Sequence, residues 1–191
     1  VLDEEGVRLS EPKLKLMGIE AVKSSTPQVC RGKIKEAIKI IMSKEQSDLH
    51  KFIADFKKEF LTLKPEMIAF PRSCNNIKKY ASNSSIFIKG TPIHVKGALI
   101  YNHQLKNLNL GMKYPYIQDG DKIKFLKLKE ANPFKFDVIS YMSTLPTEFK
   151  LKEYVDYEIQ FQKTFLDPMR FILDAINWKA EPVASLESFF G

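Results

Sequence analysis

The sequence has few of the residues that cross-link small domains or hold structural metals. Only two of its 191 residues are cysteines, Cys30 and Cys74, and they lie far apart without a C-x-x-C spacing. This pattern indicates neither a disulfide scaffold nor a zinc site. It fits a reducing, cytoplasmic compartment.

Long apolar runs are missing as well. No stretch of about 18 consecutive apolar residues is present, so we expect no membrane-spanning helix and no membrane partner. The N-terminal stretch is acidic and lacks the positive start and apolar core of a secretory signal peptide. The chain begins with Val1 instead of methionine, from which we expect a fragment of a longer polypeptide.

Common catalytic motifs are also absent, among them G-x-G-x-x-G, the Walker loop, H-E-x-x-H and G-x-S-x-G. His50, His94 and His103 have no metal-ligand spacing, so we expect them to be structural or exposed. The Asp-Gly-Asp segment at 119–121 offers two carboxylates for magnesium, but Asp-Gly before a strand is also a strong turn signal, which we favour. We therefore predict no catalytic residue, no metal site and no cofactor within this chain.

The sequence does contain enough apolar residues for a core, with 44% apolar and 12% aromatic residues, which excludes disorder. Its net charge is +7, and the excess is concentrated in one part. Residues 65–130 hold 11 basic and four acidic side chains. A folded basic face attracts polyanions, of which nucleic acid is the commonest large one. A merely soluble basic surface is the alternative.

The hydrophobic spacing predicts an α+β protein. We expect packed helices over about 27–42 and 43–60, and a helix over 93–105. Strand-like runs lie at 68–70, 85–88, 123–128 and 136–142. A long helix is predicted over 151–176, with a kink at Pro168. Helix starts are expected at Ser24, Ser25 or Thr26 followed by Pro27, and at a capping box formed by Ser43 and Gln46.

Two segments have a composition suited to phosphate. The KSSTP segment at 23–27 places a cation, three hydroxyls and a helix start together, although an ordinary helix cap explains it equally well. The segment at 74–80 combines Asn75, Asn76, Lys78, Lys79 and Tyr80, which is typical of a nucleic-acid-facing loop. A solvated loop is the alternative there.

The C-terminal segment ASLESFFG carries apolar side chains beyond the last predicted helix. A one-turn helix would place Leu186 beside Phe189 and Phe190, which makes a small plug for a pocket on another protein. The alternative is that these side chains pack on the core of the chain itself.

Several blocks in this order resemble the C-terminal end of family B DNA polymerases, and above all the replicative polymerases of T4-like bacteriophages. The blocks are EPKLKLMGIEAVKSSTP at 11–27, CNNIKKY at 74–80, IHVKGALIYN at 93–102, GDKIKFLKL at 120–128, NPF at 132–134 and YVDYEIQFQKTFLDPM at 154–169. The resemblance covers essentially the whole chain.

The resemblance implies an α+β fold: a mainly helical thumb, a small β-containing tip subdomain and a long kinked C-terminal helix. Residues 1–27 would end the palm, 28–180 would form the thumb with the tip at about 65–145, and 181–191 would be a clamp-binding tail. The partners would be primer-template duplex, the sliding clamp and the rest of the polymerase chain. The magnesium-binding aspartates would precede Val1, so this fragment would be inactive alone. The location would be the cytoplasm of an infected bacterium.

Some functional residues are implied position by position. Lys23 and Ser24 match the segment beside the primer backbone. Positions at which the family presents a cation to duplex phosphates are occupied here by Lys96, Lys122 and Lys163. At one further such position the cation is displaced, and Lys89 stands beside it. Two further cations of the family are replaced by Asp137 and Asp167. The tail resembles a clamp-binding peptide in which Val183 replaces the common glutamine. With Asn76, Lys79 and Tyr80, these lysines and Ser24 form the predicted DNA-binding set.

Two other functions remain open from the sequence. A free-standing basic adaptor that binds RNA or protein could share ancestry with polymerase thumbs. An enzyme complete within these 191 residues is the third possibility, and the missing catalytic motifs argue against it.

Overall fold

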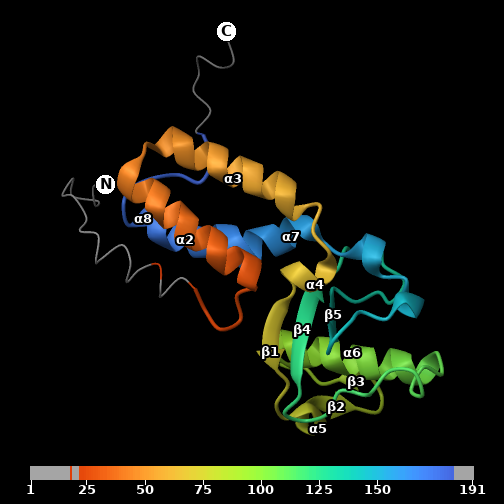
Figure 1. Cartoon of the computed structure of the whole chain (residues 1–191). Helices are drawn as coiled ribbons and strands as arrows, with labels where there is room; N and C mark the ends of the chain where they lie inside the picture. The colour runs from red at the N-terminus through yellow and green to blue at the C-terminus, as the bar shows by residue number, and fades with distance from the viewer. Residues whose placement is uncertain (1–17, 19–21, 183–191) are drawn as a thin grey trace. The chain divides into compact units, whose positions relative to one another are not determined.

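A computed structural model of the chain describes Gly18 and residues 22–182 (Figure 1). The described residues divide into two compact units, one made of those before Lys64 and after Gln160 and the other of residues 64–160. Helices and small antiparallel sheets are both present, which confirms the predicted α+β class. Within the described part of the chain, no helix is long and apolar enough to cross a membrane.

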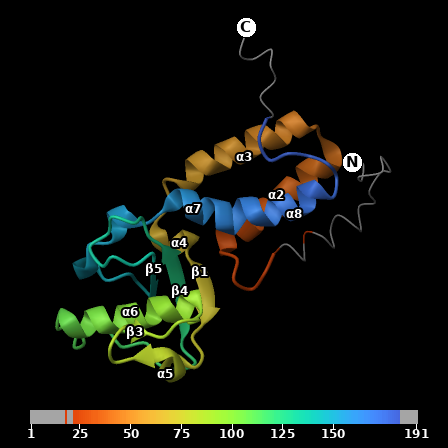
Figure 2. The ribbon, with the colours of Figure 1, turned by 180° about the vertical axis from the view of Figure 1, so that it is seen from behind.

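The first unit is helical. It contains α2 (Gln28–Ser43), α3 (Gln46–Phe60), the π-helical turn η3 (Gln162–Leu166) and α8 (Asp167–Asp174), which Figure 2 shows from behind. Its core holds a cluster of aromatic rings in which Phe56 contacts Phe60, Phe161 and Phe165 at centroid distances of 5.9, 5.6 and 4.8 Å. Burying such large rings removes much apolar surface from water and stabilises the unit. The two helices predicted over 27–42 and 43–60 are confirmed.

The helix starts differ from those predicted. Helix α2 has Pro27 as its N-cap and no side-chain cap, so Ser24, Ser25 and Thr26 do not cap it. The capping box of α3 is formed by Glu45 and Asp48 instead of by Ser43 and Gln46. Ser43 instead donates a hydrogen bond to the carbonyl of Lys39 within the last turn of α2, 2.7 Å away.

The long C-terminal helix begins later than predicted. Residues 151–156 form the 3-10 turn η2 (Lys152–Tyr154) and a β-bridge from Val155 to Leu128, and helix α7 covers Tyr157–Phe161. Leu151 and Val155 are buried, as their spacing predicts, but the α-helix predicted for residues 151–156 is wrong. The π turn then precedes Pro168, with the Asp167 N–H bonded to the Gln162 carbonyl. A proline lacks the N–H that a regular helix needs there, and a wider turn accommodates it.

The second unit has a three-stranded antiparallel sheet in the order β1-β4-β5. Its strands are β1 (Phe70–Ser73), β4 (Lys122–Lys127) and β5 (Val138–Tyr141), with Phe70 opposite Phe125 and Leu126 opposite Ile139. The short helix α4 (Pro65–Ile68) precedes β1 and the 3-10 turn η1 (Thr147–Phe149) follows β5. Helix α6 (Ile93–Asn107) confirms the helix predicted over 93–105.

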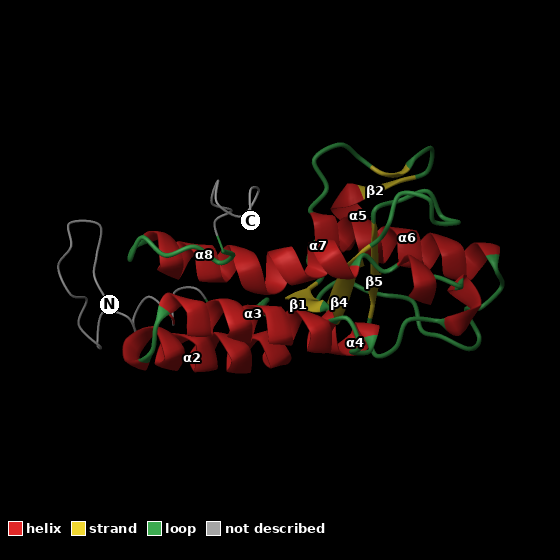
Figure 3. Cartoon of the chain, turned by 90° about the horizontal axis from the view of Figure 1, so that it is seen from above, coloured by secondary structure: helices red, strands yellow, loops and turns green. Residues whose placement is uncertain are grey.

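Helix α6 packs against β5 (Figure 3). Gly97 permits the close approach, because a Cβ at this position would lie 2.8 Å from the backbone nitrogen of Ser140. Ser140 donates a hydrogen bond from its hydroxyl to the carbonyl of His94, 2.8 Å away. The short helix α5 (Ile77–Tyr80) and the hairpin of β2 (Ala81–Ser82) and β3 (Ile86–Phe87) lie along the chain before α6.

Candidate nucleic-acid interface

The predicted turn at 119–121 holds helix α5 in place. Asn76 precedes the helix with a left-handed φ of 62°, and its main-chain N–H donates to the carboxylate of Asp119. The N–H of Ile77 donates to the same carboxylate oxygen at 3.4 Å. Gly120 supplies the positive φ of 85° that the turn requires, and Asp121 accepts from Gln118 N–H at 2.8 Å. The turn interpretation is confirmed, since both carboxylates bind main-chain amides.

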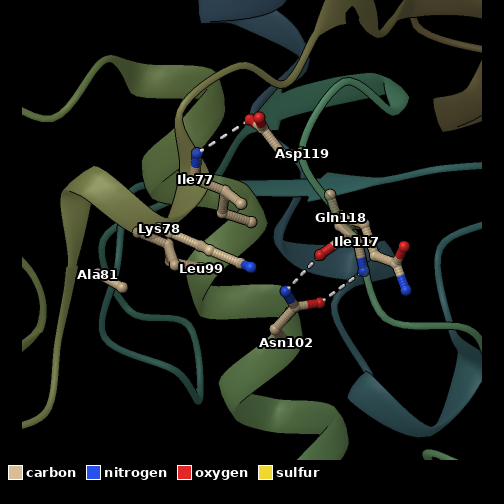
Figure 4. Close-up of a pocket in the computed structure, with 8 residues that line it drawn as sticks. All are labelled: Ile77, Lys78, Ala81, Leu99, Asn102, Ile117, Gln118 and Asp119. Atoms are coloured by element: carbon tan, nitrogen blue, oxygen red, sulfur yellow. Dashed lines mark hydrogen bonds between the residues drawn. The ribbon is translucent and has the colours of Figure 1, made fainter.

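An open pocket of about 560 Å³ lies beside this turn (Figure 4). Apolar side chains of Ile77, Leu99 and Ile117 line it together with Lys78. Asn102 also lines the pocket, and its side-chain amide donates to the carbonyl of Ile117 at 2.9 Å and accepts from the same residue's N–H at 2.8 Å. These bonds hold the segment before the turn against α6.

The hairpin of β2 and β3 joins helix α5 to α6 in one basic surface. The N–H of Ile88 bonds the Tyr80 carbonyl at 3.0 Å, and the Lys79 ammonium lies 5.4 Å from the centroid of the Tyr80 ring. The Lys96 ammonium lies 5.0 Å from the centroid of Phe87. Because Lys89 follows Ile88 directly, the structure brings four of the predicted DNA-binding residues together. The tip surface, as we name it, consists of Lys79, Tyr80, Phe87, Ile88, Lys89, Ile93 and Lys96.

Lys122 lies where β4 pairs with the end of β1. It is exposed and stands opposite Ser73 in the register. Arg72, also exposed, precedes Ser73 and interacts with His94 at the start of α6. Burial lowers the pKa of His94 below its ordinary value and the Arg72 charge lowers it further, while a hydrogen bond from the imidazole to the Ser73 backbone opposes them. Arg72 therefore joins the candidate interface, although it is not among the residues that the sequence predicts to bind DNA.

Asp137 reduces the positive charge of this unit. Its carboxylate accepts a hydrogen bond from the Lys127 ammonium at 2.9 Å. That hydrogen bond is the main reason why the pKa of Asp137 is lowered; burial opposes the shift and the Lys96 charge adds to it. One carboxylate thus interacts with two lysines, one of them in the tip surface.

In the first unit, the predicted residues Lys23 and Ser24 are exposed on the turn before α2. The Thr26 hydroxyl accepts from the Lys23 N–H at 3.1 Å. Arg31 holds the turn from within the helix, donating to the carbonyls of Thr26 at 2.9 Å and Ser24 at 2.8 Å. The structure thus fixes the backbone of this turn and leaves the Lys23 and Ser24 side chains exposed.

Lys163, the remaining predicted cation, is exposed in the π turn. Its ammonium lies 3.5 Å from the Asp167 carboxylate, which also lies 3.3 Å from Arg170. Asp167 therefore partly offsets two positive charges of this unit, as Asp137 does in the other. Exposed pairs of this kind contribute about 0–1 kcal/mol to stability.

The predicted tail residues Leu186, Phe189 and Phe190 lie outside the described residues. Within the described residues, no three or more His, Cys, Asp or Glu side chains form a group that could hold a metal ion. Burial raises the pKa of each of the buried thiols, Cys30 and Cys74, to about 11, so neither is poised as a nucleophile. The described residues are instead suited to binding an anion through the exposed cations described above.

Comparisons with known proteins show which proteins the chain resembles. No family model matches the sequence. The chain is 32% identical over 195 residues to the DNA-directed DNA polymerase of Enterobacteria phage T4, and 34% identical over 194 residues to that of Escherichia phage RB69. Each match covers 100% of this chain and 21% of the relative. The similarity therefore identifies the chain as the counterpart of one segment, about a fifth in length, of the DNA polymerases of T4-like bacteriophages.

Proposed function

We propose that the chain is the C-terminal part of a replicative family B DNA polymerase and that it binds primer-template duplex through the phosphate backbone. The observation that carries the proposal is the match over the whole chain to the T4 and RB69 polymerases. In this proposal residues 1–27 end the palm, residues 28–180 form the thumb with its tip at about 65–145, and residues 181–191 form the tail.

Lysines at the surface, of which Lys96 is half-buried, support binding to phosphates. Lys79, Lys89 and Lys96 in the tip surface, together with Lys122, present ammonium groups from one unit. Lys23 and Lys163 add cations in the other unit. Contacts to phosphates position a protein on a duplex without reading its sequence, which is what a polymerase requires of the surface that holds newly made DNA.

The catalytic step of the parent enzyme would join a primer 3′-hydroxyl to a deoxynucleoside triphosphate. Magnesium supplies charge stabilisation for such phosphoryl transfer. The described residues do not fit this ion, because Asp119 and Asp121 bind main-chain amides. We assign the magnesium site to other parts of the polymerase. This chain contributes by holding the duplex, and a misplacement of about 1 Å at the reacting atoms can cost about 10²-fold in rate.

The tail at 181–191 is proposed to bind the sliding clamp through Leu186, Phe189 and Phe190. Three apolar side chains within five residues are suited to a pocket on a partner. In this proposal the protein works in the cytoplasm of an infected bacterium, with the rest of the polymerase chain and the clamp as its partners.

The dependence of duplex affinity on salt tests the proposal. Replacing Lys96, Lys122 and Lys163 by alanine should make the plot of log K against log salt shallower by up to about three, because each phosphate contact contributes about 0.9. A matched variant with Lys35, Lys58 and Lys106 replaced, all exposed, makes the same change in net charge. An equal change of slope in both variants, or none in the first, would contradict the assignment.

A second measurement tests the catalytic part. The 191-residue chain, incubated with primed template, magnesium and nucleotides, should give no primer extension. Reproducible extension by the purified chain would overturn the view that the catalytic groups lie in other parts of the polymerase.

A further inference from the structure

Arg31 in the first unit binds the main chain of the turn formed by residues 23–26. It lies near the start of α2 and is half-buried. Its Nε–H donates to the carbonyl of Thr26 at 2.9 Å, and its Nη2 group donates to the carbonyl of Ser24 at 2.8 Å. The ion pairs among the described residues do not include Arg31. Its guanidinium is therefore committed to this turn and not to a carboxylate.

Two further hydrogen bonds close the 23–26 turn, both between its first and last residues. The Thr26 N–H donates to the Lys23 carbonyl at 2.9 Å, and the Lys23 N–H donates to the Thr26 hydroxyl at 3.1 Å. Pro27 follows directly and restricts the backbone of Thr26 to extended conformations. Together with the two bonds from Arg31, these contacts occupy the carbonyls of Lys23, Ser24 and Thr26 with donors of the chain itself.

The side-chain groups that the 23–26 turn leaves available are hydrogen-bond donors. Lys23 and Ser24 are exposed, and within the described residues neither side chain has a hydrogen-bond or ion-pair partner. A phosphate oxygen accepts hydrogen bonds from ammonium and hydroxyl groups and is repelled by carbonyl oxygens. By binding two carbonyls, Arg31 offsets their negative ends and keeps the backbone that carries Lys23 and Ser24 in one conformation.

The guanidinium group has the shape that this task needs. It is a planar fork whose N–H donors have fixed directions, so it can bind two carbonyls at once. An ammonium group on a flexible stem carries the same charge but does not fix two carbonyls in one geometry. The replacement Arg31→Lys therefore changes the support of the turn and leaves the net charge of the chain as it is.

We propose, resting on the proposed duplex binding, that Arg31 is a positioning residue for DNA: it holds Lys23 and Ser24 ready for one phosphate of the duplex without contacting the duplex itself. Fixing the turn before binding lowers the conformational entropy that is lost when the two side chains engage a phosphate. The role thus depends on the two hydrogen bonds of Arg31 and not on its charge.

The dependence of duplex affinity on salt tests this role. The experiment uses the 191-residue chain and a fluorescein-labelled primer-template duplex in fluorescence anisotropy. We expect Arg31→Lys to bind about three- to tenfold more weakly, which is within the usual range for coupled residues. Its plot of log K against log salt should be shallower by up to about one, as for Lys23→Ala, because each phosphate contact contributes about 0.9. A residue that acted through its charge alone would show neither change.

Arg170→Lys is the matched control. It makes the same chemical change at an exposed position of the same unit, where the guanidinium lies 3.3 Å from the Asp167 carboxylate. Its affinity and slope should equal those of the parent chain. A double-mutant cycle then joins the two residues: Arg31→Lys should cost less affinity in the Lys23→Ala background than in the parent, because Arg31 acts through the turn that carries Lys23.

Melting temperatures show whether each variant is folded. If Arg31→Lys fails to fold, Thr26→Val provides the same test, because it removes the hydroxyl that accepts from the Lys23 N–H and nearly keeps the shape of the side chain. It should weaken binding and lower the slope in the same way.

Three results would overturn the inference: parent-like binding by the folded turn variant, an equal loss in Arg170→Lys, or fully additive losses in the cycle. Parent-like binding by Lys23→Ala is a distinct result. It would refute the proposed phosphate contact at this turn, and the role of Arg31 would fall with it. A loss in Lys23→Ala beside parent-like binding by Arg31→Lys would refute the role of Arg31 alone.

Discussion

The carboxylate of Asp119 accepts hydrogen bonds from the main-chain N–H groups of Asn76 and Ile77, which lie 43 and 42 residues earlier in the sequence. This contact ties the start of α5 to the turn that leads into β4. Lys79 and Lys122, on either side of the contact, are therefore held by one folded element and not by two independent loops.

Replacing Asp119 by alanine removes the acceptor from both N–H groups. The carboxylate is exposed and water can partly take its place, so we expect a loss of about 1 kcal/mol in the free energy of unfolding. Urea denaturation measures this loss. The control is Asp55→Ala, an exposed carboxylate on α3. Equal stability of the two variants would show that the cap contributes nothing.

Gln160 is fully buried and joins two separate segments of the second unit. Its side-chain NH₂ group donates to the Ile68 carbonyl at 2.8 Å, and its side-chain oxygen accepts from the Lys127 main-chain N–H at 2.9 Å. Gln160→Leu leaves both main-chain groups without these partners, and each loss costs about 1–3 kcal/mol. We expect a drop of about 3 kcal/mol by urea denaturation. Gln162→Leu, at an exposed position, should change little, and similar losses in both would contradict the prediction.

Asp137 should weaken DNA binding. Its carboxylate pairs with Lys127 and interacts with Lys96, so it lowers the positive potential beside the tip surface. We predict that Asp137→Asn binds duplex about two- to tenfold more tightly, with a salt slope steeper by up to about one. Glu130→Gln, an exposed position in the same unit, is the control for net charge. If Glu130→Gln tightened binding to the same extent, the effect would come from the net charge of the chain and not from the position of Asp137.

The lowered pKa of His94 makes stability depend on pH. As pH falls below the ordinary value of 6.5, the unfolded chain takes up a proton before the folded chain does. Stability due to this group is therefore lost as pH falls from 6.5 toward the lower pKa of the folded state. His94→Gln should flatten this part of the curve in denaturation measured at several pH values. His103→Gln, at an exposed position, should leave it as steep as in the parent. If the stability of His94→Gln fell with pH as steeply as that of the parent, the lowered pKa of His94 would be contradicted.

The tail should bind the clamp without supporting the fold. We expect Leu186→Ala, Phe189→Ala, Phe190→Ala to abolish binding to the sliding clamp of a T4-like phage in surface plasmon resonance. The melting temperature should stay within a few degrees of the parent, because the tail is not proposed to pack on the core. Ser185→Ala, Ser188→Ala is the control within the same segment. A large fall in melting temperature would favour the alternative in which the tail packs on the chain itself.

Local patterns predicted the elements that depend on local physics. Apolar residues three and four positions apart correctly predicted α2, α3 and α6, since one buried stripe is enough to define an amphipathic helix. The same reasoning failed at 151–156. Leu151 and Val155 are buried at helical spacing there, but Val155 forms a β-bridge with Leu128. Burial periodicity cannot distinguish a helix from a 3-10 turn followed by an extended residue.

The candidate interface was only partly predictable. Lys79, Lys89, Lys96 and Lys122 were selected by composition and resemblance, and the basic composition of residues 65–130 could have added Arg72, which is exposed at the end of β1. Nothing local showed that the isoleucines at 88 and 93 are exposed, because most isoleucines at such positions are buried. The pairing of Asp137 with Lys127 could not be predicted either, since it depends on the register of two neighbouring strands.

The sequence by itself determined the helices, the basic middle segment and the relationship to phage polymerases, because these depend on residue order and local spacing. Only the tertiary structure decided which cations lie together, because the hydrogen bonds and ring contacts that gather them connect residues distant in the chain. It also decided which carboxylates offset those cations. Electrostatic interactions depend on separation in space, and that separation exists only once the chain has folded.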